Sequence, residues 1–212
     1  MKDGTIAAIV LAAGRSSRMG RHKLLLPLGG RPLVTYAVQA ACASSADPVC
    51  VVLGYQASEV EAALPSGRYT VRVNPDFASG MASSLRAGIE TVMMLPTENG
   101  HHLGAIILLA DQPLVSSGLI NRLLMCAGTA PEAIIAAVYA GQRGTPVYFP
   151  HALFPELRNI TGDEGGRSVI AHHPDLLKLE TIEEYALGLD VDREEEYEQL
   201  LAQWDRYSTN PG

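Results

Sequence analysis

Short runs of apolar, β-rich sequence alternate with longer stretches of helical pattern along most of the chain. The apolar runs are continuous, which is typical of strands that helices cover on both faces. Predicted strands span residues 6–12, 49–54, 69–73, 104–110, 133–139 and 146–149. Predicted helices span 32–45, 57–65, 81–95, 116–128 and 193–207, and a glycine-rich loop leads into another near 167. This alternation predicts an α/β protein with helices on both sides of a mainly parallel sheet.

Composition limits the class of protein. The 212 residues are 47% hydrophobic, which is enough for one large core, so we expect a single domain over residues 1–212. A net charge of −7 argues against a general binder of nucleic acid or anionic membranes. The apolar runs are far shorter than the roughly 20 residues of a membrane helix, and no long apolar stretch follows Met1. Three widely spaced cysteines suit a reducing compartment, so we expect a cytoplasmic protein.

Ligands of such sheets bind beyond the carboxyl ends of the strands, where loops lead into helices. The loops predicted at that edge are rich in Gly, Ser, Arg or Asp, as a polyphosphate site assembled from several strands requires. They comprise residues 12–23, 74–84, 110–115, 141–146 and 189–196.

The first loop is the most basic. Ala12, Ala13 and Gly14 are small enough for a ligand to approach the backbone N–H groups, and Arg18 and Lys23 add positive charge. The loop matches neither the Walker A pattern nor G-x-G-x-x-G, which disfavours a dinucleotide-dependent dehydrogenase. A solvated basic loop without a ligand is the alternative.

Asp111 follows the apolar run 104–110 directly, so it should lie at the carboxyl end of a strand. A carboxylate there suits Mg²⁺, although an aspartate that caps the next helix is the alternative. A second carboxylate is expected from residues 189–196. Asp190 and Asp192 are both candidates, because alternation along a strand would point them to one face.

The stretch LAAGRSSRMGRHK, residues 11–23, resembles the signature of nucleotidyltransferases with a Rossmann-like fold. Its continuation KLLLPLGGRPLV is most similar to the MobA/MocA-like NTP transferase family, whose members attach a nucleotide to the molybdenum cofactor. NPDFASGMASSLRAG, LLADQPLV, GQRGTPVYF and TGDEGGRSVI support the same family. The resemblance implies a Rossmann-like three-layer α/β/α fold.

The resemblance also implies a division of the site. Lys23, Arg18 and Asp111 would be catalytic, Asp111 and Asp192 would hold Mg²⁺, and the acceptor would bind to Arg143, Gly144, Gly165, Gly166 and Arg167. The nucleotide-binding residues would be Leu11, Ala12, Ala13, Gly14, Arg15, Ser16, Arg18, Lys23, Gly80, Met81, Ser84 and Ala110. The substrates implied are an NTP and a molybdopterin-type acceptor, and a molybdoenzyme is a candidate recipient. Family members with LAAG, as here, usually use CTP, whereas those with LAGG use GTP.

Alternatives remain at several positions. Ser84 could line a helix without touching a base, Asn74 could be a turn residue, and the arginines of the acceptor motifs could face solvent. The histidine pairs 101–102 and 172–173 are expected to be exposed and to carry no chemistry. Alternative functions are a guanylyltransferase of the same cofactor, a sugar- or alditol-phosphate nucleotidyltransferase, and a non-catalytic chaperone that binds molybdopterin.

Overall fold

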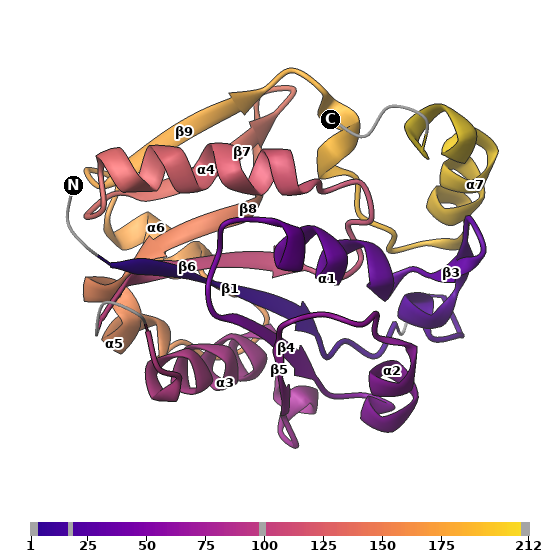
Figure 1. The fold of residues 1–212 in the computed structure, drawn as a ribbon, viewed down its shortest axis with the longest axis horizontal. Helices are drawn as coiled ribbons and strands as arrows, with labels where there is room; N and C mark the ends of the chain where they lie inside the picture. The colour runs from indigo at the N-terminus through magenta and orange to yellow at the C-terminus, as the bar shows by residue number, and fades with distance from the viewer. Residues whose placement is uncertain (1–3, 17–18, 98–100, 209–212) are drawn as a thin grey trace.

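A mainly parallel sheet forms the centre of the molecule (Figure 1). The computed structural model describes residues 4–16, 19–97 and 101–208. Within them the sheet has the strand order β5-β4-β1-β6-β8-β7-β9. Its strands are β1 (Thr5–Ala12), β4 (Val49–Leu53), β5 (Thr70–Val73), β6 (His102–Leu109), β7 (Ile134–Tyr139), β8 (Gln142–Pro150) and β9 (Leu177–Ile182). A short hairpin, β2 (Pro27–Leu28) and β3 (Arg31–Pro32), lies outside this sheet.

Among the described strands of the large sheet, β8 alone runs antiparallel to its neighbours. β1 pairs in parallel with β4 and β6, β4 pairs in parallel with β5, and β7 pairs in parallel with β9. β8 is antiparallel to both β6 and β7. The α/β fold with a mainly parallel sheet is therefore confirmed. The parallel pairing of β1 with β6 brings the loops that follow Ala12 and Leu109 to the same edge.

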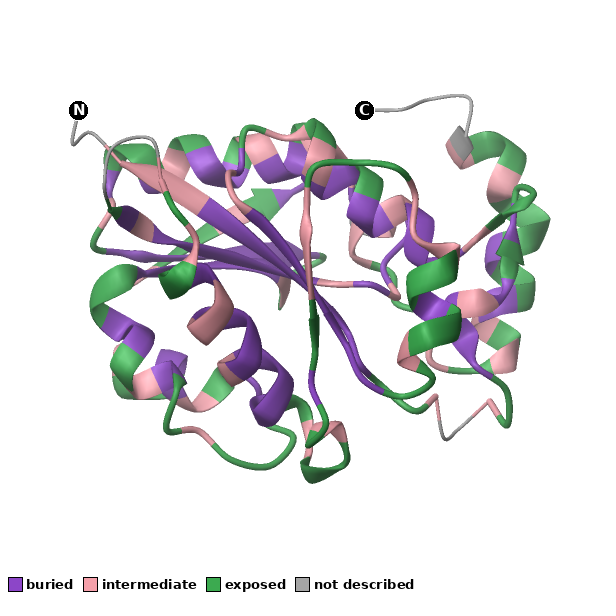
Figure 2. Cartoon of the chain, turned by 60° about the horizontal axis from the view of Figure 1, so that its bottom comes forward, coloured by how far each residue is buried: buried purple, intermediate pink, exposed green. Residues whose placement is uncertain are grey.

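Helices cover both faces of the sheet (Figures 1 and 2). They are α1 (Val34–Ala43), α2 (Ala57–Ala63), α3 (Met81–Met94), α4 (Ser117–Thr129), α5 (Phe154–Leu157), α6 (Arg167–His172) and α7 (Glu194–Ser208). One core packs α1, α4 and parts of α2 and α7 against one face of the sheet. The other packs α3, α5 and α6 against the opposite face.

The sequence of β1 explains why both faces carry helices. Ala8 and Val10 lie in the core beneath α1 and α4, whereas Ala7 and Ile9 lie in the core beneath α3. All four are fully buried, so this strand has no solvent-facing side (Figure 2). Gly88 lets α3 pack closely on β1, because a Cβ atom at that position would lie 2.5 Å from Ile9 Cγ2.

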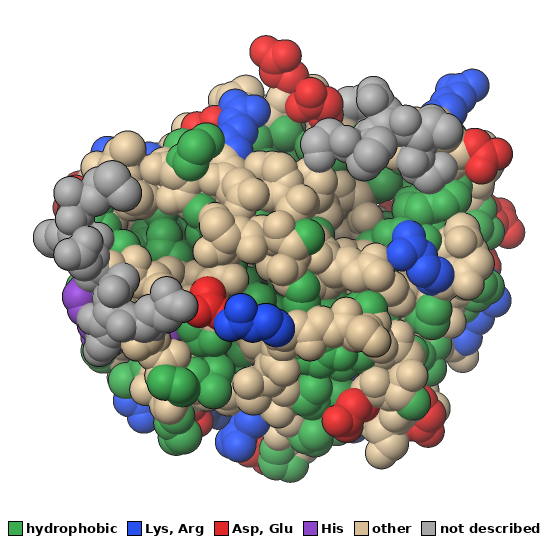
Figure 3. Space-filling view, viewed as in Figure 1, with side chains coloured by type: hydrophobic (Ala, Val, Ile, Leu, Met, Phe, Trp, Pro, Cys, Tyr) green, Lys and Arg blue, Asp and Glu red, His purple; other side chains and the backbone are tan. Residues whose placement is uncertain are grey.

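Charged side chains of both signs lie scattered on the surface (Figure 3). On the face seen in Figure 3, lysine and arginine side chains are spread singly among acidic, polar and hydrophobic groups. Within the described residues, no helix is both long enough and apolar enough to span a bilayer.

The structure departs from the sequence predictions in several places, and the short elements β2, β3 and α5 were not predicted. β9 was missed, because LKLETI is an edge strand whose residues are mostly half-buried or exposed and lack a continuous apolar run. β8 begins at Gln142, so most of the predicted loop 141–146 is strand. Residues 189–192 form no strand. His102, predicted to be exposed, is 8% exposed, since it begins β6, a strand with a neighbour on each side. His173, also predicted to be exposed, is half-buried.

Candidate active site

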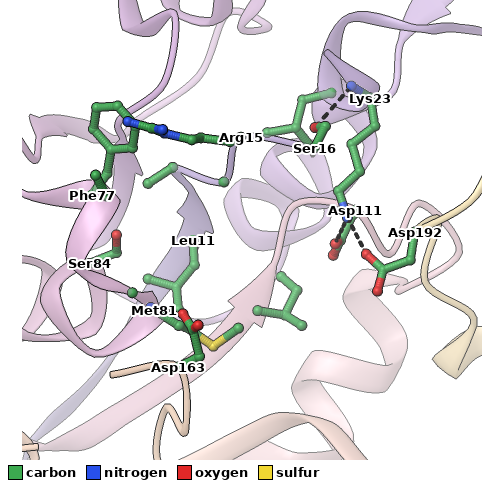
Figure 4. Close-up of a pocket in the computed structure, with 16 residues that line it drawn as sticks. Leu11, Arg15, Ser16, Lys23, Phe77, Met81, Ser84, Asp111, Asp163 and Asp192 are labelled. Atoms are coloured by element: carbon green, nitrogen blue, oxygen red, sulfur yellow. Dashed lines mark hydrogen bonds and ion pairs between the residues drawn. The ribbon is translucent and has the colours of Figure 1, made fainter. Parts of the chain in front are cut away.

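A cavity of about 470 Å³ opens at the carboxyl ends of β1 and β6 (Figure 4). Side chains and backbone from five separate segments line it. The residues that line it are Leu11, Ala13, Gly14, Arg15, Ser16, Lys23, Leu24, Phe77, Ala78, Gly80, Met81, Ser84, Leu109, Asp111, Asp163 and Asp192. The predicted loops after β1, β5 and β6 therefore meet here, together with residues before α7.

Lys23 is held in place by the loop that follows β1. Ser16 has a left-handed backbone, with φ of 55°, and its Oγ accepts a hydrogen bond from the backbone N–H of Lys23 at 3.1 Å. Lys23 then begins a short 3-10 turn, Lys23–Leu25, and is only 8% exposed. The loop thus presents the lysine side chain to the cavity rather than to solvent (Figure 4).

Two carboxylates surround the Lys23 ammonium group. Its Nζ lies 2.5 Å from Asp111 Oδ2 and 2.6 Å from Asp192 Oδ1. Burial alone lowers the pKa of Lys23, but the two neighbouring carboxylates outweigh it and raise the pKa above its ordinary value. Lys23 is therefore fully charged at neutral pH, and its charge holds two acidic groups together.

Asp111 has capacity for a further ligand. It lies two residues after the end of β6, and its Oδ1 atom is buried without a hydrogen-bond partner among the described residues. A buried carboxylate oxygen without a partner is costly unless a cation or water satisfies it. Two carboxylates converging on one point, one with a free oxygen, are the donor set that Mg²⁺ or Mn²⁺ prefers. The residues present therefore fit a divalent metal.

The structure separates the two aspartates that alternation left equivalent. The backbone N–H of Val191 donates to the carbonyl of Asp111 at 3.0 Å, which fixes the segment before α7 against the end of β6. Asp192 then faces Lys23 in this cavity, whereas Asp190 lines a neighbouring one. The prediction that both point to one face of a strand is wrong, since no strand forms there. Burial, with the charges of Asp111 and Asp192, raises the pKa of Asp190.

Glu196 fixes the backbone at Asp192. One oxygen, Oε2, accepts from the Asp192 N–H at 2.7 Å and from the Arg193 N–H at 2.9 Å. This is the capping contact of an acidic residue in the first turn of a helix. Glu196, in the first turn of α7, therefore also holds the backbone that carries Asp192.

The opposite end of the cavity is lined by an aromatic residue, Phe77, and by a small polar one, Ser84. The Arg15 guanidinium lies 5.1 Å from the centre of the Phe77 ring. Asn74 is 4% exposed, and its Nδ2 donates to Ser83 Oγ at 2.9 Å and Ser84 Oγ at 3.0 Å. Asn74 is thus more than a turn residue, because it fixes the serine that faces the cavity.

A second cavity, of about 520 Å³, adjoins the first and shares Leu11, Met81, Leu109 and Asp163 with it. All five residues of the predicted acceptor side line it: Arg143, Gly144, Gly165, Gly166 and Arg167. Gln112 also lines it, accepting from Thr145 Oγ1 at 2.6 Å and donating to the Gly188 carbonyl at 3.1 Å. The lysine–carboxylate cluster thus lines the first cavity, and the two arginines line the adjoining one.

Some predicted residues do not line the site. Ala12 and Ala110 are each 1% exposed and pack in the core beneath α1 and α4. Arg18 lies outside the described residues. Sequence reasoning missed Phe77 and Asp163, because neither an aromatic residue in a loop nor an aspartate beside glycines identifies its partner.

Comparisons with known proteins identify the family of this chain. The MobA-like NTP transferase domain matches residues 8–176. The chain belongs to the MobA-like NTP transferase family. This membership supports nucleotidyl transfer from an NTP as the class of activity, and it confirms the resemblance inferred from the sequence motifs.

Proteins similar to this chain carry different names. The chain is 33% identical to nicotine blue oxidoreductase from Paenarthrobacter nicotinovorans, over 92% of this chain and 96% of that protein. It is 30% identical to the purine catabolism protein PucB from Bacillus subtilis (strain 168), over 80% of this chain and 82% of that protein.

Among solved structures, Rv0371c from Mycobacterium tuberculosis H37Rv superposes with a TM-score of 0.79 at 28% identity, covering 94% of this chain and 98% of that one. The same protein has been crystallised in complex with manganese, and that structure superposes with a TM-score of 0.74 at 28% identity, covering 93% and 98% of the two chains. These similarities extend over nearly the whole MobA-like chain, so its fold is that of the family.

Proposed function

We propose that this protein transfers a nucleoside monophosphate from an NTP, with CTP favoured, to the phosphate of a molybdopterin-type acceptor. Pyrophosphate is the second product, and the reaction depends on Mg²⁺. The observation that carries the proposal is the placement of Lys23 between Asp111 and Asp192, at the side of a cavity that adjoins one lined by Arg143 and Arg167. A polyphosphate with a bound divalent metal suits the first cavity, and a second anion suits the arginines.

Asp111 and Asp192 would hold Mg²⁺, which when bound neutralises phosphate oxygens. Support comes from the unsatisfied Asp111 Oδ1 atom and from the manganese complex of the related Rv0371c protein. The ammonium group of Lys23, which lies beside both carboxylates, would neutralise the charge that grows on the α-phosphate as it is attacked.

The bond changes follow from the two substrates. An oxygen of the acceptor phosphate forms a bond to the α-phosphorus, and the bond from that phosphorus to the bridging oxygen of the β-phosphate breaks. Pyrophosphate leaves with the electron pair. Because the attacking oxygen is already an anion, alignment and charge neutralisation are sufficient without a general base.

The triphosphate would lie against the first loop. We propose backbone contacts from Gly14, Arg15 and Ser16, which line the first cavity. Arg18 would hold the β- and γ-phosphates, on the basis of the family motif. The aromatic and serine end of the cavity would then take the base and ribose.

The choice of CTP rests on the LAAG sequence and on the shape of the base end. Ala13 lines the cavity where family members that use GTP carry glycine, and its methyl group leaves less room for a purine. Ser84, oriented by Asn74, is the proposed hydrogen-bond partner of the base. Shape with one or two hydrogen bonds gives about 10–200-fold discrimination.

The molybdopterin assignment rests on the segments 141–149 and 161–170, which resemble the acceptor motifs of the family. Arg143 and Arg167 would pair with the acceptor phosphate, and Gly144, Gly165 and Gly166 would allow it to approach the backbone. A molybdoenzyme would then receive the nucleotide-bearing cofactor.

Pyrophosphate release with CTP, GTP and ATP, each with molybdopterin and Mg²⁺, tests the proposal. We expect release that requires both substrates and favours CTP over GTP by at least about tenfold in kcat/KM. A preference for GTP would make the protein a guanylyltransferase. Release with a sugar phosphate but not with molybdopterin would change the acceptor class, and molybdopterin binding without release from any NTP would indicate a carrier.

A further inference from the structure

The N-terminus of α3 and the loop before α6 lie in close contact, although about 80 residues separate them in sequence. Gly80, the residue before α3, has φ of 111°, which side-chain-bearing residues rarely adopt. A Cβ atom there would lie 2.4 Å from the Gly162 carbonyl oxygen and 2.8 Å from Asp163 Oδ1. Only glycine fits at this point, because the other loop occupies the space.

This contact also supplies the cap that α3 lacks. Gly80 has no side chain with which to accept a hydrogen bond from the first turn of the helix. Instead, the Met81 N–H donates to Asp163 Oδ1 at 3.1 Å and the Ala82 N–H donates to the Gly162 carbonyl at 3.0 Å. A negative charge at this end of the helix is also favourable. The first turn of α3 therefore depends on a distant segment for its hydrogen bonds.

Asp163 occupies the boundary between the two cavities. It lines both of them, as does Met81. Figure 4 shows these two side chains in the first cavity. The residues on one side, Gly80 and Ser84, belong to the proposed nucleotide side. Those on the other, Gly165 and Arg167, belong to the proposed acceptor side and follow Asp163 in the same loop. Asp163 thus joins the two halves of the site.

We propose that Asp163 is a positioning residue for NTP binding: by capping α3, it fixes the backbone at Gly80 and Met81 and the direction of Ser84. The inference rests on the proposed function, because it assumes that the first cavity binds the NTP. Without this cap, the first turn of α3 is less ordered, and the affinity for the nucleotide falls. Loss of the cap leaves Lys23, Asp111 and Asp192, which lie on other elements, in place for the reaction.

Direct binding of CTP with Mg²⁺ by calorimetry tests this with three variants. In Asp163→Ala, the Kd for CTP should rise about fivefold or more, the equivalent of a lost helix cap. Asp163→Asn retains an oxygen that accepts the Met81 N–H, so its Kd should stay within about twofold of the wild-type value. Ser116→Ala is the matched control, because Ser116 caps α4 through the Leu119 N–H at 3.2 Å and lines neither cavity.

Steady-state kinetics add a second readout. Asp163→Ala should raise the KM for CTP while kcat at saturating CTP stays within about threefold, as expected when only nucleotide binding is lost. Thermal melts should show similar losses of stability in Asp163→Ala and Ser116→Ala, but only the former should lose CTP affinity.

The outcomes are distinct. An unchanged Kd in Asp163→Ala would overturn the inference and leave the proposed function standing. Tighter binding in both Asp163 variants would also overturn it, since repulsion between the carboxylate and the triphosphate would then dominate. A wild-type protein that binds no NTP would overturn the proposed function, and the inference with it.

Discussion

The Nζ atom of Lys23 lies 2.5 Å from Oδ2 of Asp111, and the same ammonium group contacts Asp192 at 2.6 Å. One buried cation therefore balances two carboxylates from segments that lie far apart in the sequence. A divalent metal bound by the same carboxylates would take over this balance. The lysine and the proposed metal are thus linked, and changes at Lys23 should alter both catalysis and the response to metal.

Replacing Lys23 with alanine should lower kcat by about 100-fold or more while raising the KM for NTP much less, because its charge matters most when negative charge grows on the α-phosphate. Without metal, the variant leaves two carboxylates facing each other, so Mg²⁺ should raise its melting temperature more than that of the wild type. Steady-state kinetics and melts with and without Mg²⁺ measure both effects. Lys178→Ala, at an exposed position of β9, is the control. A change confined to KM would show that Lys23 only binds the nucleotide.

The two neighbouring aspartates should differ in their effect on metal binding. Asp192→Asn removes a carboxylate that faces Lys23 in the first cavity, whereas Asp190→Asn alters the second cavity. We expect Mn²⁺ affinity, measured by electron paramagnetic resonance, to fall about tenfold or more in Asp192→Asn and to change little in Asp190→Asn. Asp111→Asn should lose both metal affinity and, by about 100-fold or more, turnover. The reverse order of the Asp190 and Asp192 effects would reassign the second metal ligand.

Glu196 should affect the metal site without touching it. In Glu196→Ala, the backbone N–H groups of Asp192 and Arg193 lose their acceptor, so Asp192 is no longer fixed. Mn²⁺ affinity should fall about three- to tenfold, in line with a lost capping interaction of roughly 1 kcal/mol. Glu196→Gln keeps an accepting oxygen, so this variant should retain most of the wild-type Mn²⁺ affinity. Glu195→Ala, at the exposed neighbouring position, controls for the general loss of acidic charge near α7. Equal losses in all three variants would refute a specific role for Glu196.

The free energy of unfolding should decrease as the pH is lowered, because of His102. Burial lowers the pKa of this histidine from its ordinary value of 6.5, and nearby Val92 and Leu95 carbonyls offset only part of the effect. The unfolded chain therefore binds the proton more readily. This contribution to the free energy of unfolding is complete above about pH 6.5 and is lost as the pH falls toward the lowered pKa.

Denaturant melts of His102→Leu between pH 7.5 and 5 should consequently show a weaker dependence on pH than those of the wild type. His101→Leu, a change at the exposed adjacent position, should retain the wild-type dependence. Parallel curves for His102→Leu and wild type would assign the acid sensitivity to other groups.

The fold followed from the sequence because its strands are buried on both faces. Runs such as 6–12 and 104–110 show hydrophobicity without alternation, and each is followed by a helix or a glycine-rich loop. β9 had no such signal, since an edge strand needs apolar contacts on fewer of its residues. The extent of β8 was hidden by Gly144 and Pro146, residues that usually indicate a loop.

The candidate site was predictable where a single segment carries several site residues, as do residues 11–23. It was not predictable where the contact joins distant segments. Nothing local indicates that Asp163 caps α3, because the cap and the helix are about 80 residues apart. The choice between Asp190 and Asp192 likewise depended on the hydrogen bond between Val191 and Asp111, which replaces the expected strand.

The order of elements along the chain has a consequence for synthesis. β9 ends at Ile182, whereas Asp192 lies in the segment that leads into α7. On the ribosome, the strands can therefore pair on a nascent chain, with Lys23 against Asp111, before the second carboxylate has emerged. The proposed metal site is then incomplete throughout translation of the sheet. We therefore expect an unfinished polypeptide to transfer no nucleotide before Asp192 has emerged.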